Sequence, residues 1–192
     1  PRQRDQDGDA GARGKLRQYR AKQEMIAGPR GDLVAALPVT WSFRTDPDND
    51  GLVAGWFDPG AGSGWKPIDT TRCWEAQGYQ DDTTLRGYNG LAWYRTSFTV
   101  PASFKGRRIR LFIGGINNQG WCWVNGAIAD QIPHHAGYMR WRYHHEIDIT
   151  DQVRFDAPNE LTIRVLNDDS FGGLFRRSFV YAARPDATPP QE

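Results

Sequence analysis

The sequence is poor in cysteine, in charge of one sign and in long apolar runs. Only Cys73 and Cys122 among its 192 residues are cysteine, which excludes a disulfide framework and a zinc site built from clustered thiolates. No stretch approaches the roughly 20 consecutive apolar residues that a membrane-spanning helix needs. The 24 Lys and Arg nearly balance the 23 Asp and Glu, which leaves a net charge of +1. We therefore expect neither nucleic acid nor a membrane as a partner.

Aromatic and turn-forming residues are plentiful instead. The chain holds 8 Trp, 7 Tyr, 21 Gly and 12 Pro. This composition is typical of an all-β domain with many turns, in which exposed aromatic rings are the usual means of stacking on sugars. A first residue of Pro rather than Met suggests a segment of a longer protein.

The chain divides into three parts by composition. Residues 1–32 form a charged tail with a short helix over 15–26, residues 33–184 form the folded domain, and 185–192 form a Pro-rich linker or tail. The helix stops at Gly28-Pro29, and it docks on the domain or bridges to a preceding one. Its narrow apolar face consists of Leu16, Tyr19, Gln23 and Ile26.

The stretch from Gly120 to Asp130 contains the strongest local signal in the chain. Asn125-Gly126 between apolar residues predicts a β-hairpin with a two-residue turn. The register that follows places Trp123 opposite Ile128 and Cys122 opposite Ala129. One face of the hairpin then carries Cys122, Val124, Ala127 and Ala129, and the other carries Trp121, Trp123 and Ile128. Both faces are largely apolar, so we expect one on the core and the other covered or used for binding.

Alternating strand patterns recur along the rest of the domain. Turn residues separate them, and no helical pattern intervenes. The segments are 39–43, 91–100, 107–113, 146–149, 160–166 and 174–182. Short strands in this number predict an all-β jelly-roll sandwich.

Several longer motifs follow one another in order between Val39 and Ala182. They are Gly90-Leu-Ala-Trp-Tyr-Arg-Thr-Ser-Phe-Thr-Val-Pro101, Arg110-Leu-Phe-Ile-Gly-Gly-Ile116, Trp123-Val-Asn-Gly126, His135-Ala-Gly-Tyr138, Ile147-Asp-Ile-Thr150, Asn159-Glu-Leu-Thr-Ile-Arg-Val165 and Gly172-Gly173. Their order and spacing resemble the sugar-binding jelly roll at the N-terminus of glycoside hydrolase family 2 enzymes. The resemblance implies a galactose-binding-like β-sandwich, either fused to a catalytic barrel or serving as a carbohydrate-binding module. It also favours an extracellular or periplasmic location.

The resemblance implies a binding role rather than catalysis. In that family the hydrolytic carboxylates lie on a separate barrel, so we expect a non-catalytic carbohydrate-binding or accessory domain of a polysaccharide-degrading protein, without a cofactor. One alternative is a sandwich that only braces a neighbouring catalytic domain. Another is a fragment of a glycosidase or esterase, which would need paired carboxylates or a catalytic triad.

Sugar binding requires an aromatic face together with side chains that hydrogen-bond hydroxyl groups. In several family members an acidic residue just before the Gly-Gly pair contacts the sugar, and ungapped matching puts Asn167 at that place. Trp41, Trp93 and Trp123 lie in predicted strands and are expected in the core, whereas Tyr88, Tyr138 and Trp141 are expected to be exposed. The candidate residues lie in three loops and are Tyr88, Asn89, His134, His135, Tyr138, Trp141, Asn167, Asp168 and Asp169.

Two motifs have the composition of metal sites. Asp46-Pro-Asp-Asn-Asp-Gly51 fits the first half of a calcium loop through Asp46, Asp48 and Asp50, although the closing Glu is missing and an Asx-rich turn explains the same residues. The pairs His134-His135 and His144-His145 are either transition-metal ligands, or polar loop residues, or residues that hydrogen-bond a sugar. We expect at most a structural calcium ion.

Overall fold

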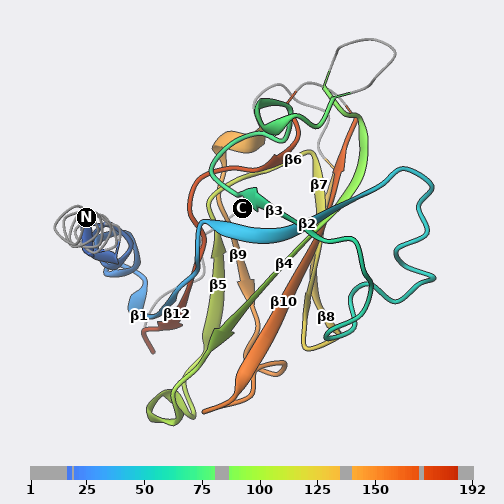
Figure 1. The fold of residues 1–192 in the computed structure, drawn as a ribbon. Coiled ribbons are helices and arrows are strands. Elements are labelled where there is room, and N and C mark those ends of the chain that lie inside the picture. Colours follow the sequence, from blue (N-terminus) through green and yellow to red (C-terminus); the bar gives the residue numbers. More distant parts are fainter. Residues whose placement is uncertain (1–16, 19, 81–86, 135–139, 169–170, 186–192) are drawn as a thin grey trace, which may run out of the picture.

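Two antiparallel β-sheets enclose one apolar core (Figure 1). This computed structural model describes residues 17–18, 20–80, 87–134, 140–168 and 171–185. The four-stranded sheet has the order β1 (Gly31–Ala36), β12 (Phe179–Ala183), β5 (Ile109–Ile113), β9 (His145–Asp148). The six-stranded sheet has the order β3 (Lys66–Asp69), β2 (Thr40–Asp46), β4 (Gly90–Thr99), β10 (Pro158–Asn167), β7 (Gln119–Val124), β8 (Ala127–Ile132). A small third sheet pairs β6 (Ile116–Asn117) with β11 (Gly173–Leu174), and the predicted β-sandwich is confirmed.

Period-two alternation along the strands separates the core from the outer faces. In β10, Leu161, Ile163 and Val165 are buried in the core between the sheets, whereas Glu160 and Arg164 lie on the other face. Removing such side chains from water is the main stabilising term of the sandwich. Strands β4 and β10 pair over ten residues, which brings the end of β10 beside the beginning of β4.

The predicted hairpin is present, with one correction to its register. Asn125 and Gly126 both have positive φ, +55° and +83°, as a type I′ turn requires. Trp123 lies opposite Ile128 as predicted, but Cys122 pairs with Asp130 rather than with Ala129. A β-bulge leaves Ala129 without a partner on β7, so the expected Cys122–Ala129 pair is wrong.

The N-terminal helix packs on the outer face of the four-stranded sheet (Figure 1). Residues 17–18 and 20–27 are helical, and Leu16 and Tyr19 of the predicted apolar face lie outside the described residues. Gln23 is buried, and its Nε2 donates to the carbonyl of Ser178 at 3.1 Å. Docking on the domain, one of the two expected roles of this helix, is what the structure shows. In the described part of the chain no helix is long and apolar enough to span a bilayer.

Strands at the two ends of the domain differ from the sequence pattern. The first strand, β1, begins at Gly31 and precedes the first predicted strand, over 39–43. The expected strand over 174–182 is two strands, β11 and β12, separated by a segment in which Arg176 has a φ of +62°. A positive φ is incompatible with a continuous strand, so the chain turns there.

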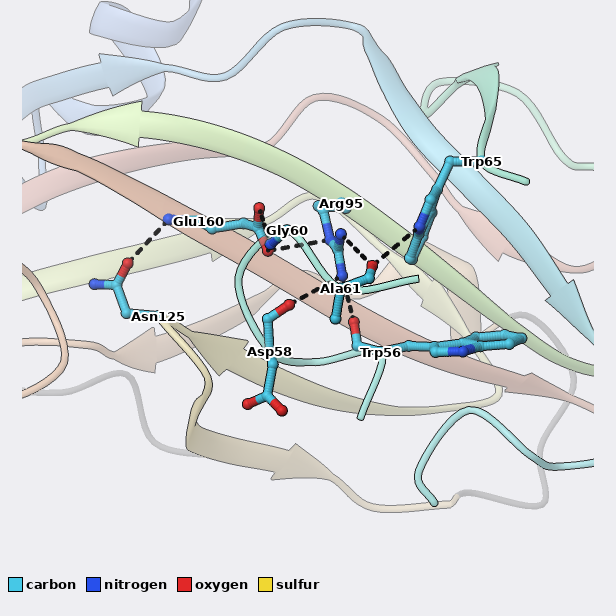
Figure 2. Close-up of polar contacts among 8 residues, drawn as sticks. All are labelled: Trp56, Asp58, Gly60, Ala61, Trp65, Arg95, Asn125 and Glu160. Atoms are coloured by element: carbon cyan, nitrogen blue, oxygen red, sulfur yellow. Dashed lines mark hydrogen bonds and ion pairs between the residues drawn. The ribbon is translucent and has the colours of Figure 1, made fainter. Parts of the chain in front are cut away.

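The outer face of the six-stranded sheet carries a second aromatic cluster. Trp41 lies in the main core as expected, but Trp93 and Trp123 pack on this outer face with Trp56, from the loop over residues 47–65. Arg95 holds that loop down, because its Nη1 donates to the carbonyl of Ala61 at 2.7 Å and its Nη2 to that of Trp56 at 2.5 Å (Figure 2). The loop covers part of the hairpin's second apolar face, since the Phe57 ring stacks on Trp123 with centroids 5.5 Å apart, whereas Ile128 is 52% exposed.

Candidate functional site

Polar side chains from four segments meet at one end of the sandwich. Asn167, the last residue of β10, pairs with Gly90, the first of β4, and so lies beside residues 88 and 89. The backbone N–H of Asn118 donates to the carbonyl of Leu166 at 2.6 Å, which brings in the segment after β6. We call this group the asparagine cluster; it consists of Asn89, Asn117, Asn118, His134, Asn167 and Asp168.

Asn167 is the centre of the cluster. Its side chain is fully buried, and a buried amide must find hydrogen-bond partners. Its Oδ1 accepts from Asn117 Nδ2 at 3.3 Å, and its Nδ2 donates to the Tyr88 carbonyl and to Asn89 Oδ1, each at 3.2 Å. These bonds hold the end of β10 against β6 and against the segment that precedes β4. The predicted site residues Tyr88, Asn89 and Asn167 are thus brought together.

The loop that follows Asn167 is held from two sides. Asn117 Nδ2 donates to the carbonyl of Phe171 at 2.9 Å, and the N–H of Gly172 donates to Glu75 Oε1 at 3.0 Å. Burial raises the pKa of Glu75, and the hydrogen bond from Gly172 opposes that rise. Position 172 has no room for a side chain, because a Cβ there would lie 1.9 Å from the buried ring of Trp74.

His134 and Asp168 form the accessible rim of the cluster. His134 Nε2 lies 2.6 Å from Asp168 Oδ2, and the two side chains are 37% and 48% exposed. The backbone N–H of Asp168 donates to Asn118 Oδ1 at 3.2 Å. This hydrogen bond restrains the backbone that carries the Asp168 carboxylate. The remaining oxygen lone pairs of Asp168 and the Nδ1 of a neutral His134 ring can accept hydrogen bonds from hydroxyl groups.

An exposed aromatic ring next to the cluster belongs to Phe171, whose side chain is 59% exposed. Tyr88 and Trp141, whose rings are expected to be exposed, are only partly exposed. Tyr88 packs edge-on against Trp74 with ring centroids 5.5 Å apart, and its hydroxyl donates to the carbonyl of Leu91. Burial raises the pKa of Tyr88 to about 12. The expectation that Tyr88 is exposed is therefore wrong. Its ring packs against Trp74 beside the cluster and is not an exposed surface for a ligand.

The remaining candidates are separate from the cluster or outside the described residues. Trp141 packs against Phe175 with ring centroids 5.6 Å apart. His135, Tyr138 and Asp169 lie outside the described residues.

The predicted calcium loop has a different arrangement. Asp46 is buried, and its carboxylate accepts from the N–H groups of Asp50 and Gly51 and from the indole Nε1 of Trp93. Over the described residues, no three His, Cys, Asp or Glu side chains come together in a way that could hold a metal ion. This geometry favours the Asx-rich turn, the alternative interpretation of Asp46, Asp48 and Asp50.

His144, the other metal candidate, lies in an ion-pair network. Its Nε2 is 3.4 Å from Glu146 Oε1, and Arg30 Nε is 2.6 Å from the same oxygen. Burial, followed by the charge of Arg30, lowers the pKa of His144. The Arg30 guanidinium this close to His144 opposes the binding of a metal cation. We therefore assign His144 to a network with Arg30 and Glu146 that anchors the turn after the helix.

Comparison with known proteins identifies the origin of this sandwich. A β-glucuronidase from Paenibacillus borealis is 33% identical over 131 residues, which cover 66% of this chain and 20% of that protein. A β-galactosidase, BoGH2A, from Bacteroides ovatus is 28% identical over 134 residues, which cover 66% of this chain and 14% of that protein. The chain belongs with the N-terminal domains of glycoside hydrolase family 2 enzymes.

The structural comparison shows the same fold in solved structures. The crystal structure of β-glucuronidase from Ruminococcus gnavus superimposes with a TM-score of 0.67 at 20% identity, over 81% of this chain and 29% of that chain. The same enzyme in complex with D-glucuronic acid gives a TM-score of 0.67 at 19% identity. No family model matches the chain. The family 2 sandwich spans no more than about a fifth of the length of the two relatives.

Proposed function

We propose that this family 2 sandwich is a non-catalytic domain that contacts a saccharide through the asparagine cluster, as part of a larger glycoside-degrading protein. The observation that supports the proposal most strongly is the His134–Asp168 pair, exposed on top of a buried amide network. The network holds the polar rim in place before any ligand arrives, and such preorganisation lowers the entropic cost of binding.

The chemistry of the rim suits a sugar ring. Hydroxyl groups both donate and accept. The Asp168 carboxylate accepts from them, and because the Nε2 of His134 is bonded to Asp168, the neutral His134 ring presents Nδ1 as a second acceptor. Phe171 supplies an exposed aromatic face for the C–H side of a pyranose. Sugar sites combine an aromatic surface with a few fixed polar groups, and the described residues provide both here.

The cluster lacks the groups that hydrolysis requires. Retaining and inverting glycosidases both use two carboxylic acids set across the scissile bond. Asp168 is the one carboxylic acid among the six residues of the cluster. We therefore assign the cluster a binding role and place hydrolysis on another part of the parent protein.

The relatives suggest the first sugars to test. Because one is named a β-glucuronidase and the other a β-galactosidase, we propose a hexose or hexuronic acid glycoside as the ligand. A glycan array that contains both classes, followed by calorimetric titration of the hits, tests this proposal. Binding to such glycans is the expected result. Binding to none of them would refute the saccharide role and favour the alternative, a sandwich that braces a catalytic domain.

Substitutions at the rim test whether the saccharide binds at the asparagine cluster. Asp168→Ala and His134→Ala should each weaken binding about tenfold or more, because a hydrogen bond to a charged group contributes about 1.5–3 kcal/mol. Asp151→Ala, which removes an exposed carboxylate in a turn, is the matched control and should leave the affinity unchanged. Equal affinities for Asp168→Ala and Asp151→Ala would place the saccharide elsewhere on the domain.

A further inference from the structure

Arginine and aromatic side chains gather beside the asparagine cluster, where two short segments meet. One segment is the short helix η3 (Arg140–Arg142), which lies next to β6 (Figure 1). The other directly follows β11 and contains Phe175 and Arg176. We call the group formed by Trp141, Arg142, Phe175 and Arg176 the arginine patch. Its two arginines are exposed, and its two aromatic rings are partly exposed.

Two glycines between β5 and β6 bring the two segments of the patch together. A Cβ at Gly115 would lie 2.2 Å from the carbonyl oxygen of Trp141, and one at Gly114 would lie 2.8 Å from the Cβ of Arg176. Only glycine leaves room for so close an approach. The N–H of Phe175 also donates to the carbonyl of Gly115 at 2.9 Å. The Gly114-Gly115 pair therefore seats the arginine patch on the sandwich.

Arg176 is held in place and still keeps donors for a ligand. Its Nη2 donates to the carbonyls of Trp141, at 3.2 Å, and Arg142, at 2.5 Å. Its Nε and Nη1 have no hydrogen-bond partner among the described residues. Its φ of +62° is uncommon for a residue other than glycine, and such backbone outliers cluster at functional sites.

The arginine patch has an excess of positive charge. In the described part of the chain, neither Arg142 nor Arg176 forms an ion pair with a carboxylate. Glu146, the acid nearest to Arg142 in the sequence, already pairs with Arg30 at 2.6 Å. An anion that reaches the patch therefore meets two guanidinium groups without displacing a carboxylate. The planar fork of a guanidinium matches the two oxygens of a carboxylate.

The aromatic half of the patch favours a sugar over other anions. The rings of Trp141 and Phe175 are in contact, with centroids 5.6 Å apart and planes inclined by 39°. The indole Nε1 of Trp141 has no hydrogen-bond partner among the residues that the structure describes, so it is free to donate to a hydroxyl group. Sugar sites combine aromatic surface with a few fixed polar groups.

The arginine patch adjoins the rim of the asparagine cluster. The small sheet pairs Asn117, a member of the cluster, with Gly173. Phe171 lies two residues before Gly173 and Phe175 two residues after it, so at most about 13 Å of extended chain separates the two rings' backbones. An oligosaccharide can therefore contact both places. A carboxylate on that oligosaccharide is repelled by Asp168 at the rim and attracted by the patch.

We propose that the arginine patch is an anionic subsite of the saccharide site. It holds the carboxylate of a uronic acid while a neutral sugar of the same chain lies on the His134–Asp168 rim. The inference rests on the proposed function and deepens it, because it names an acidic oligosaccharide, in which uronic acid and neutral sugar follow one another, as the ligand class.

Calorimetric titration with a hyaluronan tetrasaccharide, in which glucuronic acid alternates with N-acetylglucosamine, tests the proposal against the same oligosaccharide with its carboxyl groups reduced. The acid should bind at least about fivefold more tightly, since one exposed ion pair contributes up to that factor and the patch has two arginines. In ¹⁵N spectra the acid should move the indole signal of Trp141 and the backbone signals of Arg142 and Phe175. Equal binding of the two forms, or unmoved signals at these residues, would overturn the proposal.

A matched pair of variants assigns the preference to the patch. Arg142→Gln should weaken binding of the acid about fivefold and leave binding of the reduced form unchanged. Arg154→Gln, which removes an exposed arginine near the start of β10 and so at the opposite end of the sandwich, should change neither. Equal losses in the two variants would contradict the assignment. Hexaglutamate should bind more weakly than the acid, and equal or tighter binding would make the patch a site for acidic peptides instead.

Asp168→Ala separates this inference from the proposed function. It should weaken binding of both forms of the tetrasaccharide, because both place a neutral sugar on the rim. If the two forms bind equally and both lose affinity in Asp168→Ala, the saccharide site stands and the arginine patch is not part of it. If the acid loses affinity in Arg142→Gln but not in Asp168→Ala, the patch is not a subsite of the rim and the proposed role of the rim fails.

Discussion

Replacing Asn167 by Asp tests whether the asparagine cluster is held by its buried amide. The substitution keeps the shape of the side chain but exchanges an NH₂ donor for a carboxylate oxygen. That oxygen would face the Tyr88 carbonyl and Asn89 Oδ1, both acceptors now 3.2 Å from the amide nitrogen. Two hydrogen bonds would be lost, at about 1 kcal/mol each.

The larger cost comes from charge. Position 167 is fully buried, and an unpaired carboxylate there adds a desolvation penalty. Together with the two lost bonds we expect Asn167→Asp to lower the free energy of unfolding by about 3–5 kcal/mol, a large part of the roughly 5–15 kcal/mol typical of a domain. Burial would raise the pKa of the new carboxyl above its unfolded value. The cost should therefore be smallest below that unfolded pKa and should grow as the pH rises through the folded one.

Chemical denaturation at several pH values measures these differences. The matched control is Asn89→Asp, which keeps an oxygen acceptor for Asn167 Nδ2 and lies at an exposed position. We expect the control to cost less than about 1 kcal/mol. If Asn167→Asp were as stable as Asn89→Asp, the buried amide would not be what organises this end of the sandwich.

Three further predictions concern packing, the loop clamp and pH. Gly172→Ala should destabilise the fold by about 1–3 kcal/mol in thermal unfolding, because the new methyl group overlaps the Trp74 ring; an unchanged melting temperature would show that the loop yields freely. Arg95→Leu should free residues 56–61 and expose the bond after Trp56 to chymotrypsin, and resistance equal to wild type would argue against the clamp. Because burial and Arg30 lower the pKa of His144, its contribution to stability is present above its unfolded pKa and is lost as the pH falls through the folded value. His144→Gln should accordingly lose less stability than wild type on acidification, and equal losses would contradict this assignment.

The sandwich and its hairpin were predictable because local rules determine them. Asn125-Gly126 adopts the turn that its φ preferences demand, and alternation in segments such as 160–166 sets which residues face the core. The bulge at Ala129 was not predictable, since it depends on how β8 fits against β7 rather than on its own sequence. The Asp46 turn shows the same limit, because its third donor is Trp93, a residue 47 positions away.

The sequence named four of the six polar residues of the asparagine cluster, but not Asn117 and Asn118 and not the exposed ring of Phe171. Asn167 and Asp168 lie at the end of β10, and Asn89 directly precedes β4, which pairs antiparallel with β10, so these residues meet at one end; His134 follows β8. Tyr88 and Phe171 both lie in loops, and the sequence offers no local signal for which ring is buried. The difference arises from Trp74, which packs against Tyr88 and leaves Phe171 outside.

The most direct test of saccharide binding at the asparagine cluster is a map of the residues that respond to a small ligand. ¹⁵N-labelled protein titrated with methyl β-D-glucuronide, and in parallel with methyl β-D-galactoside, reports each backbone amide separately. We predict that at least one of the two sugars moves the signals of Asn118, His134, Asp168 and Phe171, and that Asp168→Ala suppresses the response. Unmoved signals at these four residues with both sugars would contradict the account.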